Sequence, residues 1–320
     1  MESDISRRSA IVAGAMTILL AACSRGSGSG ANSVLRVGDQ RGSIKSLLDT
    51  AGLLKDVPYP IEWAQFPVGA PLIEAMKAGA IDFGYVGSST LTFGLAANVP
   101  LKAVSTWRFG GPGSALLVPP NSPIRTLADL KGRRIALVRG SPGHLLVAET
   151  LRSANIPFSA VTIINMNPAD AKAALNARSI DAWAIWDPYF AIGQQQDHLH
   201  PIITSEHFGG EVETGAATPS AIADKRPQIL DFITRVDRGF QWAAAHPEPF
   251  AAAFAADTGL SPEIAHIVKS RMKVTVEPII TDASIARHQH VADIYADIGL
   301  IPHRLDISKV YDRSFVIPAR

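Results

Sequence analysis

The chain has 320 residues, with 30 Lys and Arg against 29 Asp and Glu, which gives a formal net charge of +1 at pH 7. This near balance, without a basic stripe and interleaved aromatic residues, argues against a nucleic-acid partner. The single cysteine excludes an intrachain disulfide framework, so a domain of about 300 residues must be held together by core packing.

The first residues predict an export signal rather than a part of the fold. Arg7 and Arg8 precede an apolar run at 10–22, which is shorter than the about 20 residues of a membrane-spanning helix. The run ends in Leu20-Ala21-Ala22-Cys23, which resembles the lipobox of bacterial lipoproteins, where the cysteine is lipidated. We therefore expect a lipoprotein signal peptide at 1–23, lipid attachment at Cys23, and a Gly/Ser tether at 24–33 that keeps the domain near a membrane.

Alternatives remain open for this segment. A lone cysteine is more often a buried core residue, but the position of Cys23 between an apolar run and a Gly/Ser tether favours lipidation. Ser6-Arg7-Arg8 also matches part of a twin-arginine signal, although Ser9-Ala10 replace the bulky residues usual after the arginine pair. Both the general and the twin-arginine export routes, and either membrane as the site of the anchor, fit the sequence.

The chain contains an internal repeat. The sequence AMKAGAIDFG at 75–84 matches ALNARSIDAW at 174–183, and both are typical of a helix end, a turn and a buried strand. Arg36-Val37 running into Arg41-Gly42-Ser43 is matched in the same way by Arg134-Ile135 running into Arg139-Gly140-Ser141. Two similar halves predict two similar lobes, and the crevice between such lobes is a common place for a small ligand.

Strand-like and helix-like runs alternate through the first two thirds of the chain, which is typical of mostly parallel α/β sheets. In the first lobe we expect strands at 34–38, 61–66, 83–86, 101–106 and 115–118, with helices at 43–51 and 71–78. In the second lobe we expect strands at 135–138, 161–164, 182–185 and 201–204, with helices at 144–155 and 168–177. Further helices are expected at 228–245, 247–256, 262–272 and 282–298.

Two segments are expected to carry the chain between the lobes. The punctuated stretch at 119–123 would lead into the second lobe, and residues 214–222 would lead back. Lobe 1 then comprises 34–118 and 218–320, and lobe 2 comprises 119–217. Two crossings of this kind form a hinge, about which lobes can rotate and close on a ligand.

Candidate ligand-binding residues lie where strands end and helices begin, because the first N–H groups of a helix attract anions. Gly42-Ser43 and Gly140-Ser141 have this position in the two halves, and Gly87-Ser88-Ser89 follows a first-lobe strand. Gly42-Ser43 and Gly140-Ser141 are also normal N-cap sequences, but their recurrence at matching places in both lobes supports a ligand role. Asp82 and Asp181 precede their strands and are expected to be turn or capping residues.

Further candidates follow in the second half. Trp186, with Asp187 beside it, ends a strand and would cover the apolar part of a ligand; core packing is the alternative. His144, just after Gly143, is expected in a first helical turn facing the crevice, where it can donate to an anion, or it is a solvated histidine. Thr214, on the returning segment, completes the set of candidate ligand-binding residues.

The sequence predicts no metal, cofactor or catalytic site. His198 and His200 are two residues apart, as are His288 and His290, a spacing that does not place both on one helical face. Metalloprotease, hydrolase, phosphate-binding and dinucleotide-binding motifs are missing.

Several segments resemble the aliphatic sulfonate-binding proteins of bacterial ABC importers. The most specific block surrounds Trp183 and Trp186. The similar segments are GDQRGSI at 38–44, FPVG at 66–69, NSPI at 121–124, LADLKG at 127–132, DAWAIWDPY at 181–189, IP at 301–302 and LDI at 305–307. The resemblance implies an α/β, two-lobed periplasmic-binding-protein fold of type II, each lobe a mostly parallel sheet flanked by helices. It also implies an exported, monomeric protein that closes on a small organosulfonate and delivers it to an ABC permease with its ATPase.

The resemblance also carries site residues. Those that would line the site are Gln40, Gly87 to Ser89, Ser141, His144 and Trp186. The chain departs from the family pattern at Ser88, where aspartate is common, and at Leu145, where asparagine is common, and both changes alter polar contacts with a ligand. We expect an organosulfonate, with taurine, nitrate or a thiamine-precursor pyrimidine as the alternative ligands.

Three functional classes compete. A transport receptor is favoured over an enzyme of pyrimidine synthesis with His144 as its reactive residue, since that synthesis is intracellular and this chain carries an export signal. A binding module that signals through a partner protein is the third. Asp39 or Asp187 could receive the ammonium group of an aminosulfonate such as taurine, although a helix-capping role suits either residue equally well.

Overall fold

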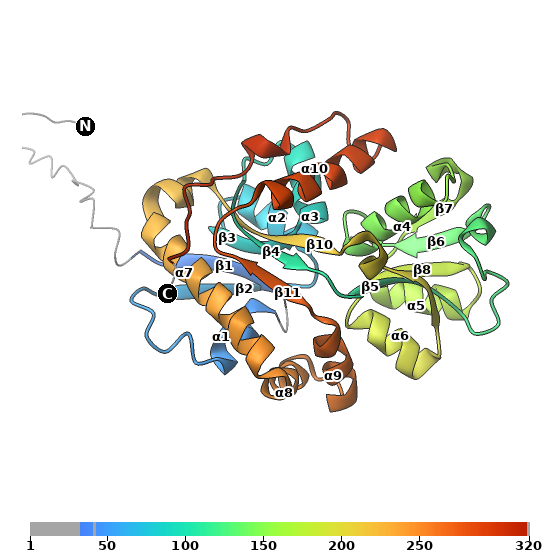
Figure 1. The fold of residues 1–320 in the computed structure, drawn as a ribbon, viewed down its shortest axis with the longest axis horizontal. Coiled ribbons are helices and arrows are strands. Elements are labelled where there is room, and N and C mark those ends of the chain that lie inside the picture. The colour runs from blue at the N-terminus through green and yellow to red at the C-terminus, as the bar shows by residue number, and fades with distance from the viewer. Residues whose placement is uncertain (1–32, 41–42, 319–320) are drawn as a thin grey trace, which may run out of the picture.

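A computed structural model describes residues 33–40 and 43–318, which form two lobes, each built on one sheet (Figure 1). Cys23, Gly42, the predicted signal peptide and nearly all of the predicted tether lie outside the described residues. The strands are β1 (Leu35–Gln40), β2 (Ile61–Phe66), β3 (Phe83–Gly87), β4 (Lys102–Phe109), β5 (Ser114–Val118), β6 (Arg134–Leu137), β7 (Thr162–Asn165), β8 (Ala182–Trp186), β9 (His200–Thr204), β10 (Glu211–Ala217) and β11 (Val274–Glu277). The α-helices are α1 (Ile44–Thr50), α2 (Gly69–Lys77), α3 (Ser88–Ala96), α4 (Pro142–Ser153), α5 (Pro168–Asn176), α6 (Tyr189–Asp197), α7 (Pro219–Ala245), α8 (Pro247–Thr258), α9 (Pro262–Arg271) and α10 (Asp282–Asp297).

The two sheets repeat one topology. The first has the order β11-β4-β10-β3-β1-β2 and the second β7-β6-β8-β5-β9. In each, three strands are parallel (β1 with β2 and β3; β6 with β7 and β8), and one antiparallel strand (β10 or β5) follows beside β3 or β8. Strand β11 is an additional edge strand of the first sheet. The repeat in the sequence is therefore a repeat in the fold, and the predicted two-lobed α/β class is confirmed.

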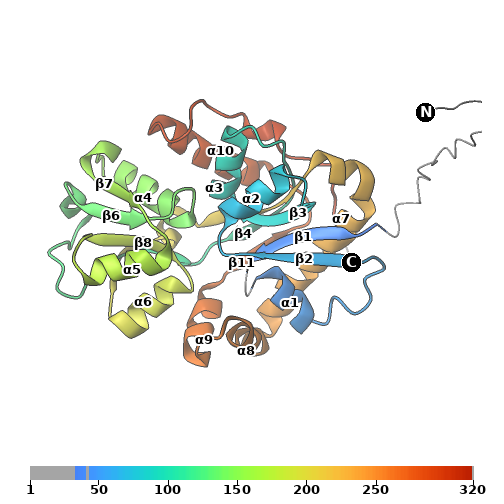
Figure 2. The same ribbon diagram turned by 180° about the vertical axis from the view of Figure 1, so that it is seen from behind.

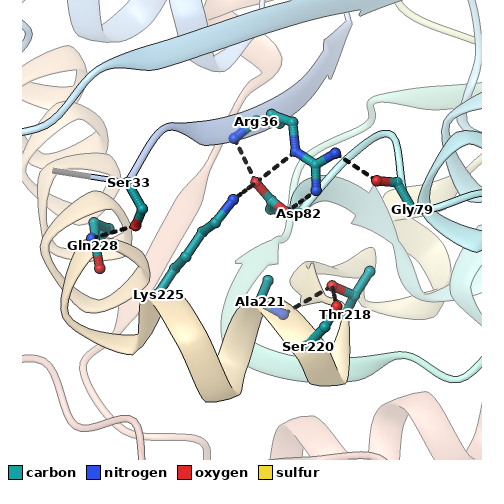
Figure 3. Close-up of polar contacts among 9 residues, drawn as sticks. All are labelled: Ser33, Arg36, Gly79, Asp82, Thr218, Ser220, Ala221, Lys225 and Gln228. Atoms are coloured by element: carbon teal, nitrogen blue, oxygen red, sulfur yellow. Dashed lines mark hydrogen bonds and ion pairs between the residues drawn. The ribbon is translucent and has the colours of Figure 1, made fainter. Parts of the chain in front are cut away.

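An Arg–Asp contact occurs at the same place in both lobes. In lobe 1 the carboxylate of Asp82 accepts hydrogen bonds from the backbone N–H of Arg36 (2.8 Å), from its Nε (3.1 Å) and from its Nη2 (2.5 Å), and Lys225 adds a further one (2.6 Å; Figure 3). In lobe 2 Asp181 accepts the same three bonds from Arg134 (2.8, 3.0 and 3.0 Å). Each ion pair connects the start of one strand to the turn that precedes the neighbouring strand. The aspartates therefore join two strands, in addition to the turn or capping role expected of them.

The chain crosses between the sheets one strand away from the expected positions. The first crossing, at 110–113, precedes β5, which pairs with β8 and β9 in the second sheet. The second, at 209–210, precedes β10, which pairs with β3 and β4 in the first sheet. The predicted boundaries at 118/119 and 217/218 thus differ from the observed ones, because a short apolar strand has no local signal that says which sheet it joins.

The two crossings pack against their surroundings so closely that glycine is required. A Cβ atom on Gly111 would lie 1.7 Å from the carbonyl oxygen of Arg271, and one on Gly210 would lie 1.7 Å from that of Phe109. The hydroxyl of Ser205 links the crossings: it donates to the carbonyl of Gly111 (3.2 Å) and accepts from the N–H of Ser114 (3.1 Å). The hinge between the lobes is therefore a compact, hydrogen-bonded unit.

Apolar side chains cover both faces of each sheet. Figures 1 and 2 show α2, α3 and α10 on one face of the first sheet and α1, α7 and α8 on the other, in agreement with two separate apolar clusters. Helix α7 is longer than expected: it begins at Pro219 and kinks at Lys225 (φ −132°). The kink lies just before Pro227, which lacks an N–H and clashes with the preceding turn.

Helices of the two lobes pack against each other on either side of the crossings. Leu145 and Ala148 of α4 pack against Val291 and Tyr295 of α10. Ala191 of α6 packs among apolar residues of α8 and α9, namely Phe254, Ile264, Ala265 and Val268. The lobes therefore meet through helices as well as through the crossing segments.

The clamp on Asp82 predicts a specific loss of stability. Burial raises the pKa of Asp82, but the hydrogen bonds from Arg36 and Lys225 outweigh it, so the net pKa is lowered. Its stabilising contribution is therefore present above the unfolded-state pKa of about 3.9 and is lost as the pH falls through the lower folded-state value. We expect Asp82→Asn to cost about 2 kcal/mol in urea denaturation at pH 7, and progressively less as the pH falls through the lowered folded-state pKa of Asp82.

Asp181→Asn is the matched control, since its side chain is 26% exposed against 3% for Asp82 and pairs with one cation rather than two. It should cost about 1 kcal/mol or less at pH 7. An equal loss in the two variants, or a loss that does not depend on pH, would contradict this account of the clamp.

Candidate functional site

Two adjoining cavities lie between the lobes. The larger has a volume of about 630 Å³ and the smaller about 220 Å³. Their linings come from β1, β3 and β10 of the first sheet and from the end of β8 and the start of α4 in the second lobe. The residues shared by both cavities are Gln40, Tyr85, Pro142, Trp186 and Glu213. The two cavities are therefore the two ends of one interlobe cleft.

The larger cavity has an aromatic wall. Rings from both lobes line it, and Trp186 packs edge-on against Tyr189 with ring centroids 6.1 Å apart. The aromatic lining residues are Phe66, Tyr85, Phe109, Trp186, Tyr189, Phe240, Phe250 and Phe254. A wall of this kind binds the apolar part of a ligand by removing it from water.

The start of α1 is occupied by a carboxylate of the protein itself. Asp39 accepts from the backbone N–H groups of Ile44 (3.1 Å) and Lys45 (2.9 Å). Burial raises the pKa of Asp39 to about 6, against the opposing effect of these hydrogen bonds. Ser43 lines the larger cavity, so it lies in the cleft as expected, while the donors of the helix start face Asp39.

The start of α3 is also occupied from within. Ser88 and Ser89 are fully buried, and Glu211 of β10 accepts from the N–H of Ser89 (3.0 Å) and the hydroxyl of Ser88 (3.3 Å). Burial raises the pKa of Glu211, and these hydrogen bonds oppose the rise. Gly87 lines the smaller cavity. Of the three residues expected to bind an anion here, Gly87 alone lines the cleft, because Ser88 and Ser89 are buried and each donates to Glu211.

The start of α4 faces the smaller cavity through Gly140 and Ser141. The hydroxyl of Ser141 caps the helix by accepting from the N–H of His144 (3.3 Å), and the N–H of Gly140 donates to Nδ1 of His144 (3.1 Å). Gly143 packs against β8, where a Cβ would lie 2.6 Å from the carbonyl oxygen of Ala184. Gly143 therefore supports the close approach of α4 to the sheet and lines neither cavity.

Contrary to the expectation from the sequence, His144 does not face the cleft. Its side chain is 1% exposed, and its ring lies 6.0 Å from Phe93, 6.1 Å from Phe158 and 5.5 Å from Tyr295, measured between centroids. Burial, with a smaller effect of Arg139, lowers the pKa of His144 to about 4. The histidine is therefore neutral at pH 7, and its contact with Gly140 positions the loop that does line the cleft.

The end of β8 forms the second-lobe wall. Trp186 borders both cavities as expected, and Asp187 lines the larger one. The carboxylate of Asp187 pairs with Arg271 of α9 (3.1 Å) and accepts from the N–H of Ala191 (3.0 Å). Burial raises the pKa of Asp187 to about 6, and Arg271 opposes the rise. Asp187 thus caps α6 and links it to α9.

Thr214 lies behind the cleft wall rather than in it. It is fully buried in β10, and its hydroxyl donates to the carbonyl of Val86 at 2.8 Å. It was expected to bind the ligand, but it lines neither cavity. The alternation of a strand turns its side chain away from the face that carries Glu211 and Glu213.

Sequence reasoning missed most of the charged residues that line the cleft, among them Glu211, Glu213 and Lys269. Glu211 and Glu213 are two apart on β10, and this spacing is the one signal that could have placed them on a common face. Lys269 lines the larger cavity with its ammonium 3.9 Å and 4.2 Å from the ring centroids of Phe254 and Phe250. Burial lowers the pKa of Lys269 to about 7. No local pattern around Lys269 indicates this position.

Within the described residues, no group of three or more His, Cys, Asp or Glu side chains is arranged to hold a metal ion. In the same part of the chain, no helix combines the length and apolar character needed to cross a bilayer.

The comparisons with known proteins agree with one another. A family model described as NMT1/THI5 like matches residues 66–249. A putative aliphatic sulfonates-binding protein of Escherichia coli (strain K12) is 33% identical over 85% of this chain and 86% of its own length. The chain belongs to the aliphatic sulfonate-binding family. Two solved structures of this family are also similar to it: the periplasmic aliphatic sulphonate binding protein SsuA from Escherichia coli, and the alkanesulfonate-binding protein SsuA from Xanthomonas axonopodis pv. citri bound to MOPS.

The structural likeness extends over nearly the whole of each molecule. The Escherichia coli structure has a TM-score of 0.79, 29% identity, and covers 87% of this chain and 97% of its own. The Xanthomonas structure has a TM-score of 0.81, 27% identity, and covers 88% and 99%. The resemblance to the aliphatic sulfonate-binding family and the periplasmic-binding-protein fold are confirmed. Membership of this family makes the chain a periplasmic binding protein and not an enzyme.

The buried position of His144 predicts a pH dependence of stability. The pKa of His144 is lowered to about 4 from an ordinary value of 6.5. Between these two pH values the histidine is protonated in the unfolded chain but neutral in the folded chain. The contribution of His144 is full above about pH 6.5 and declines as the pH falls toward 4, by ~3 kcal/mol in all. Urea denaturation should therefore show a smaller decline between pH 7 and pH 4.5 for His144→Gln than for the parent protein.

His303→Gln is the control for this experiment, because it makes the same substitution at an exposed position. If the His144→Gln protein declined with pH as steeply as the parent protein, the assignment of a neutral, buried His144 would be wrong.

Proposed function

We propose that this protein is the substrate-binding component of an ABC importer and that it captures an organosulfonate in the interlobe cleft. The sulfonate group binds in the smaller cavity and the organic tail extends into the larger one. The observation that carries the proposal is the division of one cleft into a small end at the start of α4 and a large aromatic end, with Trp186 bordering both. The names of the relatives support the same class of ligand.

The smaller cavity offers groups suited to a sulfonate. Gln40, Ser141 and Arg139 line it, together with the backbone at Gly87 and Gly140. Arg139 lies over the ring of Phe93, at 5.6 Å from its centroid, and donates to the carbonyl of Leu300 (3.1 Å), which leaves further guanidinium donors for a ligand. Four charge-assisted hydrogen bonds at about 1.5 to 3 kcal/mol each are compatible with micromolar binding, which needs about 8.2 kcal/mol.

The larger cavity favours an organic sulfonate over a bare anion. Nitrate would leave an apolar space of about 630 Å³ without a ligand group to fill it. An alkyl or ring portion against Trp186 gains the free energy of burying apolar surface, which helps to offset the cost of association. Ser43 and Asp187 complete the lining from the two lobes, whereas Ser88, Ser89, Gly143, His144 and Thr214 act from behind the wall by positioning it.

The proposed role in an ABC importer also implies partners and a location for the protein. The loaded protein delivers its ligand to a membrane permease with its ATPase and works as a monomer. Residues 1–23 act as a lipoprotein signal peptide, Cys23 carries the lipid, and the Gly/Ser-rich segment that follows tethers the domain at the membrane. This arrangement rests on the sequence of the segment and keeps the receptor close to its permease.

The ligand class can be tested by titration calorimetry with hexanesulfonate, ethanesulfonate, sulfate and nitrate. We expect hexanesulfonate to bind tightest, and Trp186→Ala to weaken its binding by ~10- to 100-fold, because the ring borders both ends of the cleft. Trp242→Ala is the control, since Trp242 lies on α7 and stacks on His246 outside the cleft. Tighter binding of nitrate than of either sulfonate would refute the proposal.

The lipid anchor can be tested by fractionating cells that express the chain. The parent protein should sediment with membranes, and Cys23→Ser should appear in the soluble fraction after detergent-free lysis, since it has no thiol to lipidate. Ser24→Ala should behave like the parent. Recovery of Cys23→Ser in the membrane fraction would show that something other than a lipid on Cys23 holds the protein there.

A further inference from the structure

At the boundary between the two cavities lies a carboxylate that has no partner among the described residues. Glu213 borders both cavities, and among the described residues no hydrogen bond or ion pair is made by its side chain. Asp39 is bonded to the start of α1, Asp187 to Arg271, and Glu211 to the start of α3. The two aspartates considered from the sequence as partners of an ammonium group are thus already engaged, and Glu213 is left as the acceptor that a ligand can reach.

The surroundings of Glu213 make a negative charge costly unless a cation is bound. Burial and the neighbouring Glu211 both raise the pKa of Glu213 well above its ordinary value. Gly87 lets both carboxylates approach the end of β3: a Cβ there would lie 3.0 Å from Oε1 of Glu211 and 3.2 Å from Oε1 of Glu213. A positive group of the ligand at this point would relieve the repulsion between the two glutamates.

Aromatic rings around the same point also favour a cation. Tyr85 and Trp186 share with Glu213 the boundary between the two cavities. The faces of such rings attract an ammonium group, more strongly when water is excluded. Without a positive group beside it, a sulfonate in the smaller cavity would make ionisation of Glu213 still less favourable, because the two negative charges would repel each other.

We propose that Glu213 is a specificity-determining residue that selects organosulfonates carrying an ammonium group a few bonds from the sulfonate. The inference rests on the proposed function, since it takes the sulfonate to bind in the smaller cavity. The sulfonate then contacts the start of α4 and Arg139, the ammonium group bonds to Glu213 between Tyr85 and Trp186, and any further substituent on nitrogen enters the aromatic cavity.

The test uses three probes of similar size at pH 7: taurine, whose amine is protonated, isethionate, which has a hydroxyl in its place, and ethanesulfonate, which has neither. Calorimetry with the purified parent protein should show taurine binding at least ~10-fold tighter than the other two. Glu213→Gln keeps the shape and removes the charge, and should weaken taurine by ~10- to 100-fold while leaving isethionate and ethanesulfonate within about threefold.

Glu62→Gln is the matched control, because Glu62 lies on β2, is exposed to solvent and lines neither cavity. It removes the same charge and should leave the preference for taurine unchanged. A circular dichroism melt of each variant checks that the fold is retained.

The outcomes separate the two proposals. Binding of all three sulfonates with no preference for taurine would overturn the role of Glu213 and leave the proposed function standing. Equal weakening of all three probes in Glu213→Gln would also overturn it, since that pattern belongs to a protonated Glu213 donating to the sulfonate itself. Failure of the parent protein to bind any sulfonate would refute the proposed function, and the role of Glu213 with it.

Discussion

The interlobe cleft depends on the close packing of two glycine-rich crossings. At Gly111 and Gly210 there is no space for a Cβ, because the carbonyl oxygens of Arg271 and Phe109 lie where it would be. Arg271 connects this hinge to the far lobe, since its guanidinium pairs with Asp187 at the end of β8 (3.1 Å). One residue of α9 thus contacts the hinge through its backbone and the cleft wall through its side chain, so movement of the lobes must change the position of the wall.

The charges of the cleft are arranged differently from what helix starts alone would suggest. Several helix starts near the cleft hold carboxylates of the protein: Asp39 at α1, Glu211 at α3 and Asp187 at α6. These groups take up the N–H donors that attract anions in many proteins. An anionic ligand can then bind to the start of α4 and to side chains such as Arg139. Glu213, by contrast, favours a positive group of the ligand. Such a combination of attraction and repulsion is a common basis of ligand specificity.

Much of the fold could be predicted from the sequence because its signals are local and repeated. The strands, the helices and the equivalence of the two halves follow from alternation, caps and the matching segments at 75–84 and 174–183. The positions of the crossings could not, because pairing of β5 and β10 is decided by distant strands. For the same reason Asp82 was read as a turn residue: its bond to Arg36 requires β1 and β3 to be neighbours.

The candidate site was predictable in part. Gln40, Ser43, Gly87, Gly140, Ser141, Trp186 and Asp187 do line the cleft. His144, Ser88 and Ser89 were placed on the right elements but are buried, because a helical position near a site does not give the direction of the side chain. Glu213 and Lys269 could not be found from motifs, since their positions depend on how β10 and α9 pack beside the cleft.

The most direct test of the account is a crystal structure of the protein with bound hexanesulfonate. The account predicts that the sulfonate oxygens contact Ser141, Gly140 or Arg139 at the smaller end of the cleft, that the alkyl chain lies along Trp186 into the aromatic end, and that both lobes contact the ligand. A sulfonate bound to one lobe alone, or bound at the start of α3 with Glu211 displaced, would contradict it.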